Sequence, residues 1–187
     1  MGEWVGRGRK ARRCYGFDEI ALVPGGVTIN PQEVDTSWEL AGKKYKVPIL
    51  AAAMDGVVDV NFAVAMSKLG GIAVLNLNGV QTRYEDPGDV LEKIAHANPE
   101  EATKLVQSLY LKPVQEKLIA KRIKEIKSKK GVAVVSSIPQ DAEKFGKIAQ
   151  EAGADIFVIQ STVISVKHVS SEYKVVDLAK FIKSMKI

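Results

Sequence analysis

The chain of 187 residues has the length of one domain, and its 46% hydrophobic and 26% charged residues are typical of a globular protein. This composition excludes global disorder, and no stretch reaches the roughly 20 apolar residues that span a bilayer. The single cysteine, Cys14, has no partner for an internal disulfide, and the basic N-terminus lacks the apolar segment of a secretory signal. We therefore expect a cytoplasmic protein that does not enter the membrane.

The net charge of +5 is concentrated in two segments. Residues 1–13 carry five basic residues and one acidic residue, and residues 117–130 carry seven basic residues and one acidic residue. This segregation predicts a solvated tail and a solvated helix face, and it argues against a nucleic-acid surface, whose positive charge would be distributed over one face.

Along the chain, the spacing of apolar residues changes repeatedly between that of a buried strand and that of an amphipathic helix. The expected strands cover residues 47–52, 72–75, 132–135 and 156–159. The expected helices cover residues 61–69, 86–97, a segment from 98, 114–129, 139–152 and 175–185. Gly70 follows the first helix, where a left-handed glycine can satisfy the last carbonyl groups.

Strands that are apolar on both faces and alternate with helices predict an α/β fold with a parallel sheet. A doubly wound nucleotide-binding sheet would carry a glycine-rich turn after its first strand, whereas residues 53–57 have no such pattern. The sequence therefore favours a (β/α)8 TIM barrel. A whole barrel takes about 250 residues, so four strand–helix units predict a half-barrel with two open edges and an uncovered apolar concave face.

Four segments together resemble the IMP dehydrogenase/GMP reductase family. They are YGFDEIALVP at 15–24, VPILAAAMD at 47–55, residues 63–72 and EAGADIFVI at 151–159. Residues 76–77, 82–87 and 169–170 resemble its GuaB-related subgroup. Most IMP dehydrogenases of the family carry two CBS regulatory modules, and residues 81–130 are too few to hold them. The charge distribution predicts a basic N-terminal tail over residues 1–14. The resemblance implies the N-terminal half of the barrel, without CBS modules, over residues 15–187.

The activity implied by the resemblance is the NAD-dependent oxidation of IMP to XMP through a cysteine nucleophile, a step of guanine nucleotide biosynthesis. In the family, the cysteine loop lies in the second half of the barrel, and Cys14 does not match it. We therefore expect no catalytic residue and no metal ligand in this chain, and no activity unless a C-terminal half-barrel completes it in trans.

By the same resemblance, Ala52 and Met54 would contact IMP, and Gln160, Ser161 and Thr162 would contact NAD. The family has an acidic residue where this chain has Gln160, which can donate and accept hydrogen bonds but carries no charge. Without the resemblance, Ala52 and Met54 would be packing residues at the open end of the barrel. Residues 160–162 would form a polar strand end that hydrogen-bonds to neighbouring loops.

Two other hypotheses remain open. A GMP reductase-like activity would use NADPH and release ammonia. Alternatively, the half-barrel would be a non-catalytic binding or assembly protein that associates with itself as a homo-oligomer across its open edges. In that case the basic helix around Lys121 to Lys130 would contact acidic partners or nucleic acid.

Overall fold

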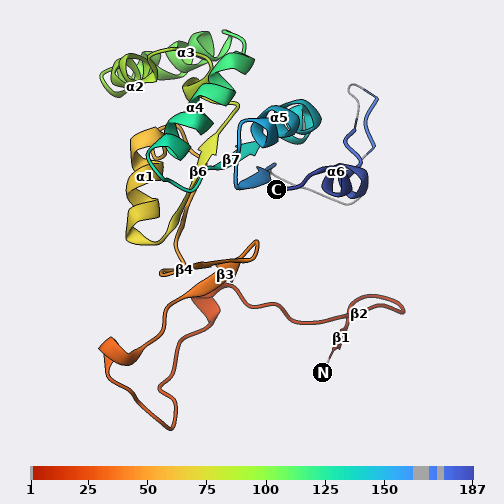
Figure 1. The fold of residues 1–187 in the computed structure, drawn as a ribbon. Coiled ribbons are helices and arrows are strands. Elements are labelled where there is room, and N and C mark those ends of the chain that lie inside the picture. The colour runs from red at the N-terminus through yellow and green to blue at the C-terminus, as the bar shows by residue number, and fades with distance from the viewer. Residues whose placement is uncertain (1, 162–168, 172–174) are drawn as a thin grey trace. The chain divides into compact units, whose positions relative to one another are not determined.

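The computed structural model describes residues 2–161, 169–171 and 175–187 (Figure 1). Contacts divide the chain into two units, Met1–Asp35 and Thr36–Ile187. None of the described helices is long and apolar enough to cross a membrane.

The first unit has no buried core, since all of its described residues are exposed. Its elements are β1 (Glu3–Trp4), β2 (Lys10–Ala11) and the 3-10 helices η1 (Phe17–Glu19) and η2 (Pro31–Glu33). Both 3-10 helices are held by local polar contacts, in which a glutamate at the third position accepts from the backbone N–H before the helix. Large apolar side chains nevertheless face solvent, with Phe17 94% exposed.

The second unit contains six strands and seven helical elements among the described residues. The strands are β3 (Trp38–Leu40), β4 (Lys43–Tyr45), β5 (Leu50–Ala51), β6 (Ile72–Asn76), β7 (Val134–Ser137) and β8 (Ile156–Ile159). The helices are α1 (Val60–Leu69), η3 (Val80–Thr82), α2 (Pro87–Ala95), α3 (Pro99–Tyr110), α4 (Glu116–Ser128), α5 (Pro139–Glu151) and α6 (Leu178–Ser184).

Four of these strands form a parallel sheet in the order β5-β6-β7-β8. The order follows the chain without the reversal that defines a doubly wound sheet. β6 and β7 are central and almost fully buried, as the apolar sequences of parallel strands require. The predicted α/β class with a parallel sheet is therefore confirmed.

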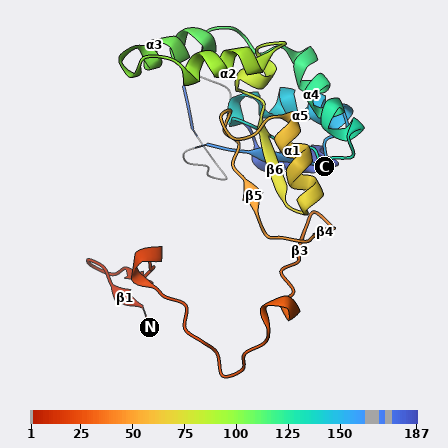
Figure 2. The same cartoon turned by 90° about the vertical axis from the view of Figure 1, so that its left-hand side faces the viewer.

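The described helices that pack on the main core lie against one face of this sheet (Figures 1 and 2). In that core, α1, α4 and α5 bury Val64, Ile123 and Phe145 against the outward side chains of β6 and β7, such as Leu75 and Val135. α1 begins at the N-cap Asp59 and ends at Gly70, whose φ of 89° confirms the left-handed stop expected there.

The opposite face carries a smaller cluster that includes Tyr45, Ile72, Val74 and Val134. The antiparallel hairpin β3–β4, which the sequence did not indicate, packs Trp38 and Tyr45 against this cluster with their ring centroids 5.7 Å apart. The Trp38 indole N–H donates to the Val47 carbonyl at 2.8 Å, which ties the hairpin to the segment before β5.

Several expected boundaries differ from the structure. The strand expected at 47–52 is only Leu50–Ala51, and the helix expected at 175–185 is α6, Leu178–Ser184, with Asp177 as its N-cap. The strand expected to stop before Ser136 continues through Ser137, because both serines pair with neighbouring strands through their backbones. Residues 80–128, where CBS modules would be inserted, fold as η3 and three α-helices.

Candidate functional site

The carboxyl ends of the four parallel strands lie at the same end of the sheet, which we call the rim. The loops that follow the strands, from distant parts of the sequence, therefore converge there. α/β proteins bind ligands at this end of the sheet. The rim residues are Ala52, Met54 and Asp55 after β5, Asn76 and Asn78 at β6, Ser136 and Ser137 at β7, and Gln160 and Ser161 after β8.

On the sheet face opposite the helices, β6, β7 and β8 each finish with a polar residue at the rim. Val74, Val134 and Val158 belong to the cluster on that face. Because side chains alternate along a strand, the residue two positions after each valine lies on the same face. These residues are Asn76, Ser136 and Gln160. The Ser136 hydroxyl is fully buried and has no hydrogen-bond partner among the residues that the structure describes, a state that costs free energy unless a ligand or water satisfies it.

Asn78 connects the loop after β6 to the start of α5. Its amide nitrogen donates to Asp141 at 2.7 Å, and its amide oxygen accepts from the backbone N–H of Ile138 at 3.0 Å. The side chain thereby fixes the spacing between two neighbouring loops of the rim.

The residues predicted to contact IMP and NAD lie on the same rim but at opposite ends of it. Ala52 and Met54 follow the edge strand β5 and are exposed, Met54 by 58%. Gln160, half-buried, and the exposed Ser161 follow the other edge strand, β8, with β6 and β7 between the two pairs. Thr162 lies outside the described residues. The binding roles of all five residues remain predictions.

Asp55 forms a contact that the sequence analysis did not single out. One carboxylate oxygen, Oδ2, accepts from the Val80 backbone N–H at 2.9 Å and from the Tyr110 hydroxyl at the end of α3. An acidic residue in the loop after a strand is a visible signal for a rim position. Its partner Tyr110 lies 55 residues away and gives no such signal.

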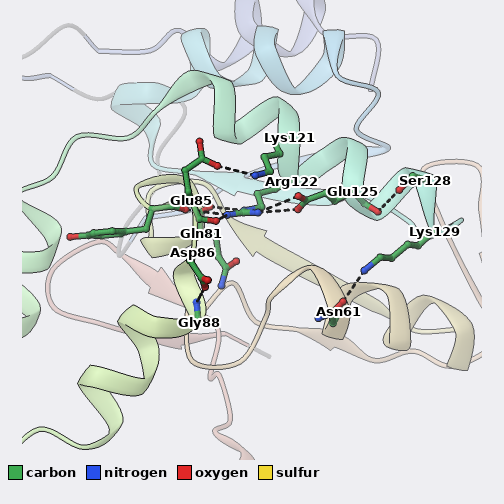
Figure 3. A network of polar contacts seen from close by, with 11 residues as sticks. Asn61, Gln81, Glu85, Asp86, Gly88, Lys121, Arg122, Glu125, Ser128 and Lys129 are labelled. Atoms are coloured by element: carbon green, nitrogen blue, oxygen red, sulfur yellow. Dashed lines mark hydrogen bonds and ion pairs between the residues drawn. The ribbon is translucent and has the colours of Figure 1, made fainter.

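Arg122 organises the segment that leads from the rim into α2 (Figure 3). It is 6% exposed, and its guanidinium donates to the carbonyls of Gln81 at 2.9 Å, Tyr84 at 3.1 Å and Glu85 at 2.6 Å. It also forms an ion pair with Glu125 at 3.0 Å. The planar fork of an arginine suits several acceptors at once, so this buried charge has a structural role.

At the opposite end of the sheet, Asp155 joins three parts of the chain. Its carboxylate pairs with Lys43 of β4 and Lys127 of α4, and it accepts from the Ala133 backbone N–H at 2.8 Å. Burial alone would raise the pKa of this carboxyl, but the hydrogen bonds from Lys127, Lys43 and Ala133 outweigh burial and lower it.

The remaining candidate groups lie away from the rim. Cys14 is exposed in the first unit, and exposed His96 caps the end of α2 with Nδ1 3.0 Å from the Glu92 carbonyl oxygen. Within residues 2–161, 169–171 and 175–187, no three His, Cys, Asp or Glu side chains are grouped as metal ligands.

A parallel sheet covered by helices on one face, with polar loops gathered at its carboxyl edge, defines the class of α/β proteins that bind small ligands at strand ends. The sequence model of the IMP dehydrogenase / GMP reductase domain matches residues 14–185. The chain therefore belongs to the IMP dehydrogenase/GMP reductase family, as its motifs predicted.

The chain spans about half the length of the uncharacterized oxidoreductases that it matches over 98% of its own length. An uncharacterized oxidoreductase of Mycolicibacterium smegmatis is 32% identical over 98% of this chain and 50% of its own length. The inosine-5'-monophosphate dehydrogenase of Methanocaldococcus jannaschii is 41% identical over 37% of this chain and 14% of its own. The crystal structure of an IMP dehydrogenase/GMP reductase-like protein from Corynebacterium glutamicum superposes with a TM-score of 0.87 and 31% identity. That match covers 100% of this chain and 50% of that one.

Proposed function

We propose that this chain supplies the N-terminal half of a (β/α)8 barrel that oxidises IMP to XMP with NAD. The C-terminal half-barrel carries the nucleophile. The observation that carries the proposal is the superposition of the whole chain on half of an IMP dehydrogenase/GMP reductase-like structure. The sequential parallel order of β5 to β8, with helices of the main core on one face, supports a barrel arrangement over a doubly wound one.

Both edges of the sheet present apolar surface suited to the missing strands and helices. At the β5 edge, Ile49 and Leu50 are 57% and 47% exposed. At the β8 edge, an open hollow of about 320 Å3 lies between β8 and α6. Apolar side chains line it, namely Phe157, Ile159, Leu178, Phe181, Ile182, Met185 and Ile187. Contiguous apolar surface of this kind marks an interaction site, and its burial would favour association with the complementary half.

In the proposed reaction, the hydrogen on C2 of IMP leaves as hydride to NAD and a water oxygen is added at C2. XMP, NADH and one proton are the products. The thiolate needed for covalent catalysis cannot come from the strand ends of this chain, because its one cysteine is Cys14. The part assigned to this chain is binding and orientation, with Ala52 and Met54 at the nucleotide and Gln160, Ser161 and Thr162 at the dinucleotide.

The rim has groups that fit a dinucleotide. NAD supplies the hydride acceptor when it is bound, and its ribose hydroxyls need hydrogen-bond partners. Gln160 provides a donor and an acceptor, and none of the described residues pairs with the Ser136 hydroxyl on the same face. Uncharged partners suffice for ribose hydroxyls, so glutamine in place of an acidic residue is compatible with this role.

The test is reconstitution. The chain is co-expressed with the C-terminal half of a full-length family member, the complex is purified, and NADH absorbance is followed after addition of IMP and NAD. Each half alone is the control, and both are expected to be inactive. A stable, folded complex that forms no NADH would refute the proposal. Oxidation of NADPH with GMP in the same complex would instead assign the reductase reaction.

Self-association is tested with the same purified proteins. Light scattering measures the molar mass of the chain alone and of the chain mixed with the C-terminal half, and so shows which complex forms. A homo-oligomer that does not bind the second half would favour the non-catalytic assembly protein and would contradict the enzymatic proposal.

A further inference from the structure

Three segments of the second unit meet at Asp55, in an arrangement that we call the rim contact. Asp55 follows β5, Gly79 and Val80 follow β6, and Tyr110 ends α3. The carboxylate oxygen Oδ2 accepts from both the Val80 N–H and the Tyr110 hydroxyl. The contact therefore links the helical hairpin α2–α3, which is remote in sequence, to the loop after the first strand of the sheet.

The position of the Asp55 carboxylate is restricted by its neighbours. No residue in the described part of the chain donates to its second oxygen, Oδ1, which is buried and packs directly against Gly79. A Cβ on residue 79 would overlap both oxygens of the carboxylate, so only glycine permits this approach. An unpaired buried carboxylate oxygen is costly, and the two donors to Oδ2 are what hold the group there.

Tyr110 is itself held in place. The Arg83 guanidinium lies 5.2 Å from the centre of its ring and donates to the Tyr110 carbonyl at 2.9 Å. Burial raises the pKa of the Tyr110 hydroxyl, and the hydrogen bond to Asp55 raises it further. The hydroxyl therefore remains a proton donor throughout the physiological pH range.

The loop fixed by the rim contact is the loop of Ala52 and Met54. Asp55 immediately follows Met54, and the Met54 carbonyl accepts from the N–H groups of Val57 and Val58, both at 2.9 Å. The Met54 N–H donates to the Ala52 carbonyl at 2.8 Å. These hydrogen bonds lie within the loop. The Asp55 side chain connects the loop to Val80 after β6 and to Tyr110 of α3.

We propose that Tyr110 and Asp55 are positioning residues, through which the α2–α3 hairpin fixes the loop carrying Ala52 and Met54 and thereby sets the affinity for the purine nucleotide. The nucleotide part of this inference rests on the proposed function. The positioning part is independent of it, because it concerns the order of the loop in the protein itself.

The first measurement is hydrogen exchange at the Val57 and Val58 amides in Tyr110→Phe. This change removes the hydroxyl and keeps the ring beside Arg83. The matched control is Tyr84→Phe, which removes another hydroxyl of the same region, one that donates to the Leu109 carbonyl at 2.9 Å. Loss of a hydrogen bond to a charged group predicts roughly tenfold faster exchange in Tyr110→Phe, equivalent to 1.4 kcal/mol, and less than about twofold in the control. Equal exchange in the two variants would overturn the inference.

The second measurement uses the reconstituted complex with the same two variants. For Tyr110→Phe we expect the KM for IMP to rise roughly tenfold with kcat changed less than about threefold, because the loop orders the nucleotide without taking part in chemistry. A general loss of folded protein would lower kcat in proportion and leave KM unchanged. Faster loop exchange with an unchanged KM would contradict the role in affinity. If the wild-type complex neither binds nor oxidises IMP, the proposed function fails, and exchange alone decides the positioning role.

Discussion

Replacement of Arg122 by methionine is the sharpest test of how the segment between β6 and α2 is held. Methionine preserves most of the apolar stem and removes the guanidinium. The carbonyls of Gln81, Tyr84 and Glu85 then lose their donor, and the Glu125 carboxylate loses its partner.

The magnitude follows from these contacts. Hydrogen bonds to a charged group contribute about 1.5–3 kcal/mol each, so the three carbonyl contacts are worth roughly 4.5–9 kcal/mol in total. Because the three bonds share one guanidinium, however, their contributions are not additive. Removal of one partner of a buried charged pair typically costs about 3–5 kcal/mol, so we expect the free energy of unfolding to fall by about 3 kcal/mol.

Urea denaturation followed by circular dichroism measures this loss. With a slope of roughly 2 kcal/mol per molar, the midpoint of Arg122→Met should fall by about 1–2 M. The control is Lys121→Met, which removes the neighbouring cation from its ion pair with Glu85, where both side chains are about half exposed. An exposed pair contributes at most about 1 kcal/mol, so its midpoint should shift by less than about 0.5 M. Equal shifts in the two variants would refute the structural role of Arg122.

Three further predictions concern the rim and the opposite end of the sheet. Gly79→Ala should lower the free energy of unfolding by about 1–3 kcal/mol, because its methyl group displaces the Asp55 carboxylate, whereas Gly56→Ala, at a position with open space around the added carbon, should be nearly neutral in the same urea titration. Asp155→Asn should destabilise the protein near neutral pH. Because the folded-state pKa of Asp155 is lowered, its contribution is present above about pH 4 and is lost as the pH falls through the lowered value, so urea midpoints of variant and wild type should converge in acid. Gln160→Ala should raise the KM for NAD of the reconstituted complex about fivefold, the effect of one neutral hydrogen bond, and an unchanged KM would remove Gln160 from the dinucleotide site.

The sequence by itself identified the α/β class and the family. Apolar periodicity records local structure, so the buried strands β6 and β8 and the helices around them were predicted close to their observed positions. The stop at Gly70 could be predicted because the left-handed conformation at a helix end is a local property of glycine. The family motifs are contiguous and therefore visible in one dimension.

The tertiary structure alone decided how distant segments meet. The strand β7 includes Ser136 and Ser137 because its backbone pairs with β6 and β8, although two serines in sequence suggest a loop. The short, charged segment of β3–β4 gave no clear periodicity, and Tyr45 of that hairpin is buried only because the sheet lies beside it. Contacts such as Asp55 with Tyr110 join residues whose separation in the chain leaves no periodic trace, so they arise from packing and could not be predicted from local pattern.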